Sequence, residues 1–192
     1  STMPAMHAAL IPHPKTPSSA VRTIEATVSR GAADVLSVRY CVRGALNGIR
    51  WPRTDAPQRT DRLWDHTWFE AFVRAPDERW YVELNFAPSG RWAAYRFTDY
   101  RTGMSDLDMT RPPHIVCRIE NNQMELHATV DLSGCVTDNG ALRLALCAVI
   151  EDQDQHKSYW ALAHPSERPD FHHADAFTMK LVAHRAARDC GG

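Results

Sequence analysis

The sequence lacks the short signatures by which most enzyme and metal-binding classes are recognised. It contains no GxSxG elbow, no P-loop and no GxGxxG after a predicted strand, so nothing indicates a serine hydrolase, a nucleotide hydrolase or a dinucleotide-binding enzyme. No two of its five cysteines have the CxxC spacing of zinc and redox motifs. Their odd number is more typical of reduced thiols in a cytosolic protein than of a disulfide framework.

The chain also lacks an excess of either charge and any long apolar run. Lys and Arg number 22 against 23 Asp and Glu, for a formal net charge of −1, which gives no electrostatic reason to expect a nucleic-acid or anionic-membrane partner. No stretch approaches the ~20 apolar residues of a membrane helix, and prolines interrupt the first 19 residues where a signal peptide would need an apolar core. We therefore expect a soluble, cytoplasmic protein. The sequence favours no particular oligomeric state.

What the chain does have is period-two alternation of apolar and polar residues, the pattern of half-buried β-strands. Ile24, Ala26 and Val28 alternate with polar residues, and the same pattern recurs between regularly spaced turns as far as Ala176–Val182. Nine or ten strands and no amphipathic helix of more than a turn or two predict one all-β domain over 20–183, a sandwich or a barrel. Residues 1–19 are predicted to form a Pro-rich extended arm that hangs free or lies across a sheet edge, and 184–192 a tail.

Two irregular connections, 44–66 and 99–113, interrupt the strands. Connections of this length in a compact domain are often functional. Between the second connection and residue 130, two alternating runs face each other across Asn121–Asn122, which predicts a β-hairpin.

The segment 64–97, WDHTWFEAFVRAPDERWYVELNFAPSGRWAAYRF, contains the candidate ligand-binding face. Alternation places Trp80, Val82, Leu84 and Phe86 on the core side of one strand. Tyr81, Glu83 and Asn85 then share the other side, with Glu70 or Arg96 alongside on neighbouring strands. Aromatic rings cover the apolar C–H faces of a sugar while carboxylates and amides bond its hydroxyls. The alternative is an ordinary solvated sheet face with cross-strand ion pairs.

Two further groups are candidates for the same site. Trp64 and Trp68 lie in or beside a loop, where a tryptophan is a candidate ligand platform. The segment His164–Asp175 mixes imidazoles and carboxylates, among them Asp170 and His172. These are metal-ligand types, but their spacing fits no standard zinc pattern, so no metal is predicted.

Two alternative functions use other residues. A haem b or redox module would draw axial ligands from His and Met side chains, and the candidates are Met104, Met109, His114, His127 and His164. An enzyme of unrecognised type would use His164, Asp170 and His172, or the carboxylates of Glu70 and Glu83 as an acid and a base in glycoside hydrolysis.

Two segments carry a family resemblance. The run LWDHTWFEAFVRAPDERWYVELNFAPSGRWAAYRFTDYRTGM and the later SYWALAHPSERPDFHHADAF resemble the bacterial DOMON-like proteins related to type 9 carbohydrate-binding modules, over about residues 20–182. The resemblance implies an immunoglobulin-like β-sandwich. It also implies a superfamily whose members bind sugars or haem, with Glu70 at the acidic strand position of the carbohydrate-binding relatives.

Together the residues and the resemblance predict a non-catalytic module that binds a carbohydrate or similar polar molecule without a cofactor. The predicted site comprises Trp64, Trp68, Glu70, Tyr81, Glu83, Asn85, Arg96, His164, Asp170 and His172.

Overall fold

The computed structural model describes residues 4–61, 63, 66–136 and 140–182. Trp64 and the predicted tail 184–192 lie outside these ranges. No helix among the described residues is long and apolar enough to span a membrane.

The described residues form twelve β-strands and three single-turn 3-10 helices, so the all-β prediction is confirmed. The strands are β1 (Met6–Pro12), β2 (Val21–Arg30), β3 (Val35–Gly44), β4 (Trp68–Arg74), β5 (Tyr81–Phe86), β6 (Trp92–Phe97), β7 (Ser105–Asp106), β8 (His114–Glu120), β9 (Gln123–Asp131), β10 (Leu142–Glu151), β11 (Lys157–Ala161) and β12 (Met179–Leu181). The 3-10 turns are Ala32–Asp34, Leu46–Gly48 and Ala174–Ala176.

The predicted count of nine or ten strands was too low, because two strands carry no readable alternation. Strand β1 lies within the segment 1–19, where prolines mask the pattern, and β7 is only two residues long. The predicted hairpin around Asn121–Asn122 is confirmed as β8 and β9, which pair from His114↔Thr129 to Glu120↔Gln123.

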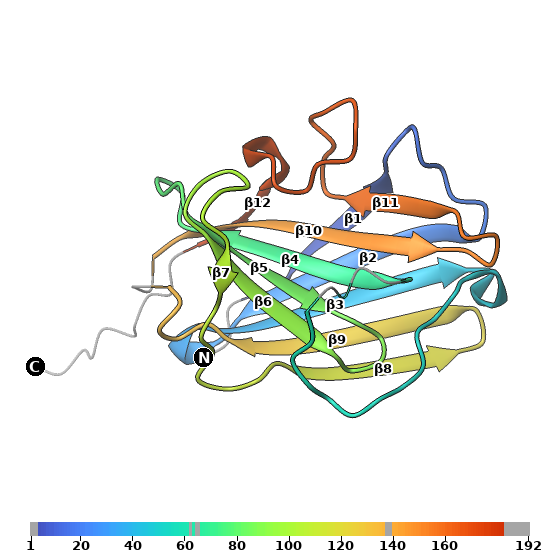
Figure 1. The fold of residues 1–192 in the computed structure, drawn as a ribbon, viewed down its shortest axis with the longest axis horizontal. Coiled ribbons are helices and arrows are strands. Elements are labelled where there is room, and N and C mark those ends of the chain that lie inside the picture. Colours follow the sequence, from blue (N-terminus) through green and yellow to red (C-terminus); the bar gives the residue numbers. More distant parts are fainter. Residues whose placement is uncertain (1–3, 62, 64–65, 137–139, 183–192) are drawn as a thin grey trace, which may run out of the picture.

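All strand pairs are antiparallel and form one sheet in the order β7-β6-β5-β4-β10-β11-β1-β2-β3-β9-β8, with β12 beside β10. The sheet curls until its two halves face each other as two layers. Strand β1 joins them: Met6 to Leu10 pair with β2 in one layer, and Ile11 and Pro12 pair with β11 in the other. Figure 1 looks onto the layer of β4, β5, β6 and β10, called here the front layer, with β2 and β3 behind it.

The main hydrophobic core fills the space between the layers. It takes alternate residues from both, such as Val38 and Tyr40 of β3 and Phe69 and Ala71 of β4. The hydroxyl of Tyr40 crosses this core and donates to the backbone carbonyl of Glu70 at 2.5 Å. A buried hydroxyl needs such a partner, and the bond ties the two layers at their centre.

The front layer is buried on its outer side as well. Every residue of β5, and every residue of β4 except Arg74, is buried. The outer side carries a second apolar cluster that includes Phe72, Tyr81 and Phe97, and residues of the segment after β11, Phe171 and Phe177, pack onto it. Because this segment covers the sheet, the polar residues of β4 and β5 are enclosed, which contradicts the alternative of a solvated sheet face.

Candidate functional site

Strand alternation brings two glutamates and an asparagine together on the outer side of β4 and β5. Glu70 of β4 pairs in register with Asn85 of β5, and Glu83 lies opposite Phe72, so all of these side chains share one side of the sheet. Only 7% of Glu70, 7% of Glu83 and 4% of Asn85 is exposed. We call these three residues the carboxylate face.

Burial changes the protonation of both carboxyl groups. It raises the pKa of Glu70 from 4.5 to about 7, although the N–H of Trp68 and the charge of Arg101 lower it. The pKa of Glu83 is raised well above 4.5, first by burial and then by the negative charge of Glu70. Since low-dielectric surroundings disfavour two adjacent negative charges, the pair retains a proton at neutral pH.

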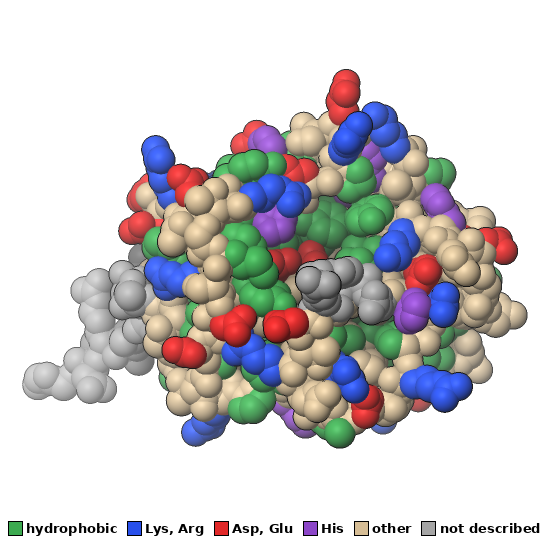
Figure 2. All heavy atoms as spheres, viewed as in Figure 1, with side chains coloured by type: hydrophobic (Ala, Val, Ile, Leu, Met, Phe, Trp, Pro, Cys, Tyr) green, Lys and Arg blue, Asp and Glu red, His purple; other side chains and the backbone are tan. Residues whose placement is uncertain are grey.

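The carboxylate face has more hydrogen-bond acceptors than donors. The Nε1–H of Trp68 donates to Glu70 Oε1 at 2.8 Å, while Asn85 Oδ1 is buried and has no hydrogen-bond partner among the described residues. Figure 2 shows acidic side chains inside a recess of the front layer, with hydrophobic atoms beside them. A group that supplies donors would satisfy this recess, because a buried acceptor without a partner is unfavourable.

Five rings adjoin the carboxylate face, from Phe72, Tyr81, Phe97, His172 and Phe177, and we call them the aromatic cluster. Tyr81 stacks on Phe97 with ring centroids 4.9 Å apart, and the edge of His172 packs against Phe72 at 5.0 Å. Such offset and edge contacts are favourable beyond the area they bury. The cluster fixes the segment around His172 against the sheet.

The proton on His172 can be assigned from its neighbours. The backbone N–H of Arg101 donates to Tyr81 Oη at 3.1 Å, so the hydroxyl proton of Tyr81 is free to donate to His172 Nδ1, 2.7 Å away. This arrangement leaves the imidazole proton on Nε2. Burial, together with the charge of Arg101, lowers the pKa of His172 to about 4, and the ring is neutral at pH 7.

Asp170 links the segment after β11, to which it belongs, to the 99–113 connection. Arg101 Nη2 donates to Asp170 Oδ1 at 2.8 Å, and the hydroxyl of Tyr100 donates to Asp170 Oδ2. Burial raises the pKa of Asp170, but the bonds from Tyr100 and Arg101 outweigh it and hold the pKa below its usual value. The ion pair therefore holds the 99–113 connection against the segment after β11.

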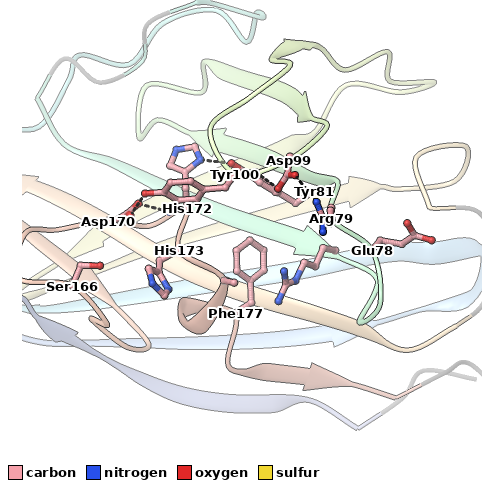
Figure 3. Close-up of a pocket in the computed structure, with 12 residues that line it drawn as sticks. Glu78, Arg79, Tyr81, Asp99, Tyr100, Ser166, Asp170, His172, His173 and Phe177 are labelled. Carbon is pink, nitrogen blue, oxygen red and sulfur yellow. Dashed lines mark hydrogen bonds and ion pairs between the residues drawn. The ribbon is translucent and has the colours of Figure 1, made fainter.

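A cavity of about 470 Å³ opens on the far side of the aromatic cluster (Figure 3). It lies between the end of the β4–β5 hairpin, the start of the 99–113 connection and the segment that precedes β12. Its lining consists of Arg74, Glu78, Arg79, Tyr81, Asp99, Tyr100, Ser166, Asp170, His172, His173, Ala174 and Phe177. We call it the arginine pocket, because Arg74 and Arg79 both face it.

Seven of the ten predicted site residues lie on or beside the carboxylate face and aromatic cluster. These are Trp68, Glu70, Tyr81, Glu83, Asn85, Asp170 and His172. Trp68 is itself a buried first residue of β4, only 7% exposed, with Lys157 Nζ 5.5 Å from its ring. Trp68→Ala would therefore remove buried packing as well as a candidate ligand contact.

Arg96 and His164 are placed elsewhere, and Trp64 lies outside the described residues. Arg96 follows the core-side alternation of β6, so its guanidinium lies over Trp80, 4.7 Å from the ring centroid. His164 bonds the carbonyl of Ile11 through Nε2 at 2.7 Å and packs against His13. Its contacts are with β1 and the residue that follows it, not with the carboxylate face.

The structure also adds residues that sequence reasoning missed, namely Arg74, Tyr100 and Arg101. Arg101 and Tyr100 belong to an irregular connection whose approach to Asp170 no periodicity could indicate. Arg74 could have been found, since it is two positions beyond Phe72 on the same side of β4.

Two of the histidines considered as haem ligands lie away from the carboxylate face. His114 and His127 lie on the exposed side of the β8–β9 hairpin, far along the sheet order from the β4–β5 pair. In the part of the chain that the structure describes, no group of three or more His, Cys, Asp or Glu side chains is arranged to hold a metal ion.

No family model and no curated protein matches the chain. The structure is similar to that of a candidate carbohydrate-binding protein from Bacteroides uniformis, with a TM-score of 0.69 and 14% identity over 90% of this chain and 84% of that one. A family 9 carbohydrate-binding module from Caldicellulosiruptor kristjanssonii, in complex with cellotriose, aligns at a TM-score of 0.50 and 12% identity over 95% of this chain and 87% of that one. The same kind of module in complex with glucose aligns at 0.42, with 12% identity over 80% and 74%, too low to support an argument. At these identities the likeness to the first two shows a shared fold.

Proposed function

We propose that this protein is a non-catalytic binding module for a carbohydrate or a similar polar small molecule, bound in the recess over the carboxylate face. The observation that carries the proposal is the unpaired, buried Asn85 Oδ1 beside two carboxyl groups of raised pKa. Such a surface selects a neutral ligand with several donors, and sugar hydroxyls are donors as well as acceptors.

The expected binding mode combines directed hydrogen bonds with ring contacts. Hydroxyl groups of the ligand donate to Asn85 Oδ1 and to Glu70, and the protonated member of the glutamate pair donates in return. Trp68 positions Glu70 through its N–H, and Trp64 is the ring that the sequence leads us to expect against the apolar face of the sugar. No bond is made or broken in this mode.

The finer assignment, an immunoglobulin-like sandwich of the DOMON-like type acting in the cytoplasm, is part of the same proposal. It is supported by the two-layered antiparallel fold and by the resemblance of residues 20–182. The Caldicellulosiruptor kristjanssonii module, whose structure contains cellotriose, makes β-glucans and their monomers the first ligands to test.

The test is calorimetric titration of the intact chain with glucose and cellotriose. Saturable binding is expected, and Asn85→Ala and Glu83→Ala should each weaken it at least about tenfold, the loss of roughly one buried hydrogen bond. Glu125→Gln, on β9 in the other layer, is the matched control and should leave affinity unchanged.

Two results would contradict the proposal. One is binding that Asn85→Ala and Glu83→Ala leave intact although both variants remain folded. The other is the absence of heat or thermal stabilisation with any of a panel of neutral mono- and oligosaccharides at millimolar concentration. Trp68→Phe, which keeps most of the ring packing, and Trp64→Ala then separate the contributions of the two rings.

A further inference from the structure

The side chain of Arg74 in the arginine pocket is incompletely satisfied. Its Nε atom is buried and has no hydrogen-bond partner among the described residues. Its guanidinium lies over Phe177, 4.8 Å from the ring centroid, a contact that holds the group in place but takes up none of its N–H donors. Arg74 is therefore a positioned donor facing a cavity.

Two more cations continue from Arg74 across the neighbouring strands. Arg143 of β10 pairs in register with Arg74 on one side and with Lys180 of β12 on the other. Side chains of directly paired residues share one side of a sheet, and like charges placed so are destabilising. We call Arg74, Arg143 and Lys180 the cationic row.

No acidic side chain in the described part of the chain neutralises this row. None of the ion pairs there involves any of its three members. Two carboxylates of the pocket are committed to other cations, Asp99 to Arg79 at 3.4 Å and Asp170 to Arg101 at 2.8 Å. The third, that of Glu78, points away from Phe177 in Figure 3.

We propose that the arginine pocket is a second binding site, which takes an oxyanion group: a carboxylate, a sulfate or a phosphate. The planar guanidinium of Arg74 presents parallel N–H donors that match two oxygens of such a group. Arg143 and Lys180 add positive potential along the row. A cavity of about 470 Å³ is large enough to hold more than the anion itself, such as a sugar that carries it.

This site is independent of the proposed sugar site. On β4, Phe72 stands between Glu70 and Arg74. On β5, Tyr81 lines the arginine pocket and Glu83 does not. The aromatic cluster thus lies between the carboxylate face and the cationic row, and either site can fail its test without the other.

The test measures thermal stability and calorimetric binding of the full chain with sodium sulfate, sodium phosphate, glucuronate and glucose, each at an ionic strength matched with sodium chloride. Saturable stabilisation by the anions beyond that of chloride is expected. Arg74→Gln should weaken it at least about tenfold, and Arg118→Gln, which removes one exposed positive charge from β8 in the other layer, should not change it.

The anions also distinguish the sources of the oxyanion. Glucuronate binding more tightly than sulfate, phosphate and glucose supports an acidic sugar, whereas equal binding of inorganic phosphate supports a free anion. If no anion exceeds chloride, or Arg74→Gln binds as the unsubstituted chain does, the proposal is wrong. If Arg74→Gln does not fold, Lys180→Gln takes its place, because Lys180 is exposed and its replacement should not disturb the fold. A lower affinity of Lys180→Gln for the anion supports the proposed site, and an unchanged affinity contradicts it.

Discussion

Glu70 is a carboxyl group that the fold keeps protonated up to neutral pH, and this has a measurable effect on stability. Because its pKa is about 7 in the folded chain against an ordinary 4.5, its contribution to stability is complete below about pH 4.5 and is lost as the pH rises through 7. With roughly 1.4 kcal/mol for each pH unit between these values, the loss amounts to about 3 kcal/mol.

Glu70→Gln should remove the part of this dependence that Glu70 contributes, since an amide keeps the size of the acid and does not ionise. It also takes the charge of Glu70 away from Glu83, which weakens the dependence that Glu83 contributes in the same direction. We expect the variant to gain stability over the unsubstituted chain by about 3 kcal/mol between pH 4.5 and 7.5, measured by urea unfolding at a series of pH values. His172 acts in the opposite sense. Its pKa of about 4 lowers stability as the pH falls from 6.5 through 4, an effect that cancels when the two proteins are compared. The control Glu125→Gln should differ from the unsubstituted chain in free energy of unfolding by an amount that does not change with pH. The same result for Glu70→Gln would contradict the protonation assigned to Glu70.

Part of the segment 1–19, predicted to be an extended arm, forms strand β1 and pairs with β2 and β11. Two substitutions test whether this strand belongs to the folded sheet. Leu10 is 3% exposed in the core while its neighbour Ile11 is 49% exposed. Leu10→Ala is therefore expected to lower the free energy of unfolding by about 2–5 kcal/mol and Ile11→Ala by under about 0.5 kcal/mol, in urea titrations. Equal, small effects at both positions would mean that the segment hangs free of the sheet.

Alternation of apolar and polar residues predicted nine or ten strands, including β4 and β5 with the correct sides for Glu70, Glu83 and Asn85. It failed for β1, which follows Pro4 and ends at Pro12, and for β7, which is too short to show a period. The prediction that put Arg96 beside the glutamates was wrong, because alternation along β6 places Arg96 on the core side with Trp92 and Ala94. Contacts such as Arg101 with Asp170 were out of reach, because they join two irregular segments whose separation in space depends on the whole fold.

At the scale of the whole molecule, a buried arginine joins the two layers at one end. Arg30, at the end of β2, is 2% exposed and pairs with Asp34 at 2.7 Å. Its Nη1 also donates to the carbonyl oxygens of Gly140, just before β10, and Val182, just after β12, at 2.5 and 3.3 Å. One side chain thus connects the back layer to two segments of the front layer.

Loss of this connection should cost far more than loss of a surface ion pair. Arg30→Ala leaves Asp34 and two carbonyl groups without their partner, and we expect about 3–5 kcal/mol of destabilisation by thermal or urea unfolding. Arg39→Ala, which removes a half-exposed arginine 3.9 Å from Glu125, should change stability by less than about 1 kcal/mol. Similar losses for both variants would show that Arg30 does not join the layers.

The position of β1 between the layers also has a consequence for the order of folding. Ile11 of β1 pairs with Ala161 of β11, which is 150 residues later in the chain. During synthesis on the ribosome, this edge of β1 therefore stays unpaired until nearly the whole domain has been made. Contacts between such distant residues form slowly. Pairing of β1 with β2 can occur early, but closure of the two layers through β11 belongs to the last stage of synthesis, and until then the edge of β1 is open to other chains.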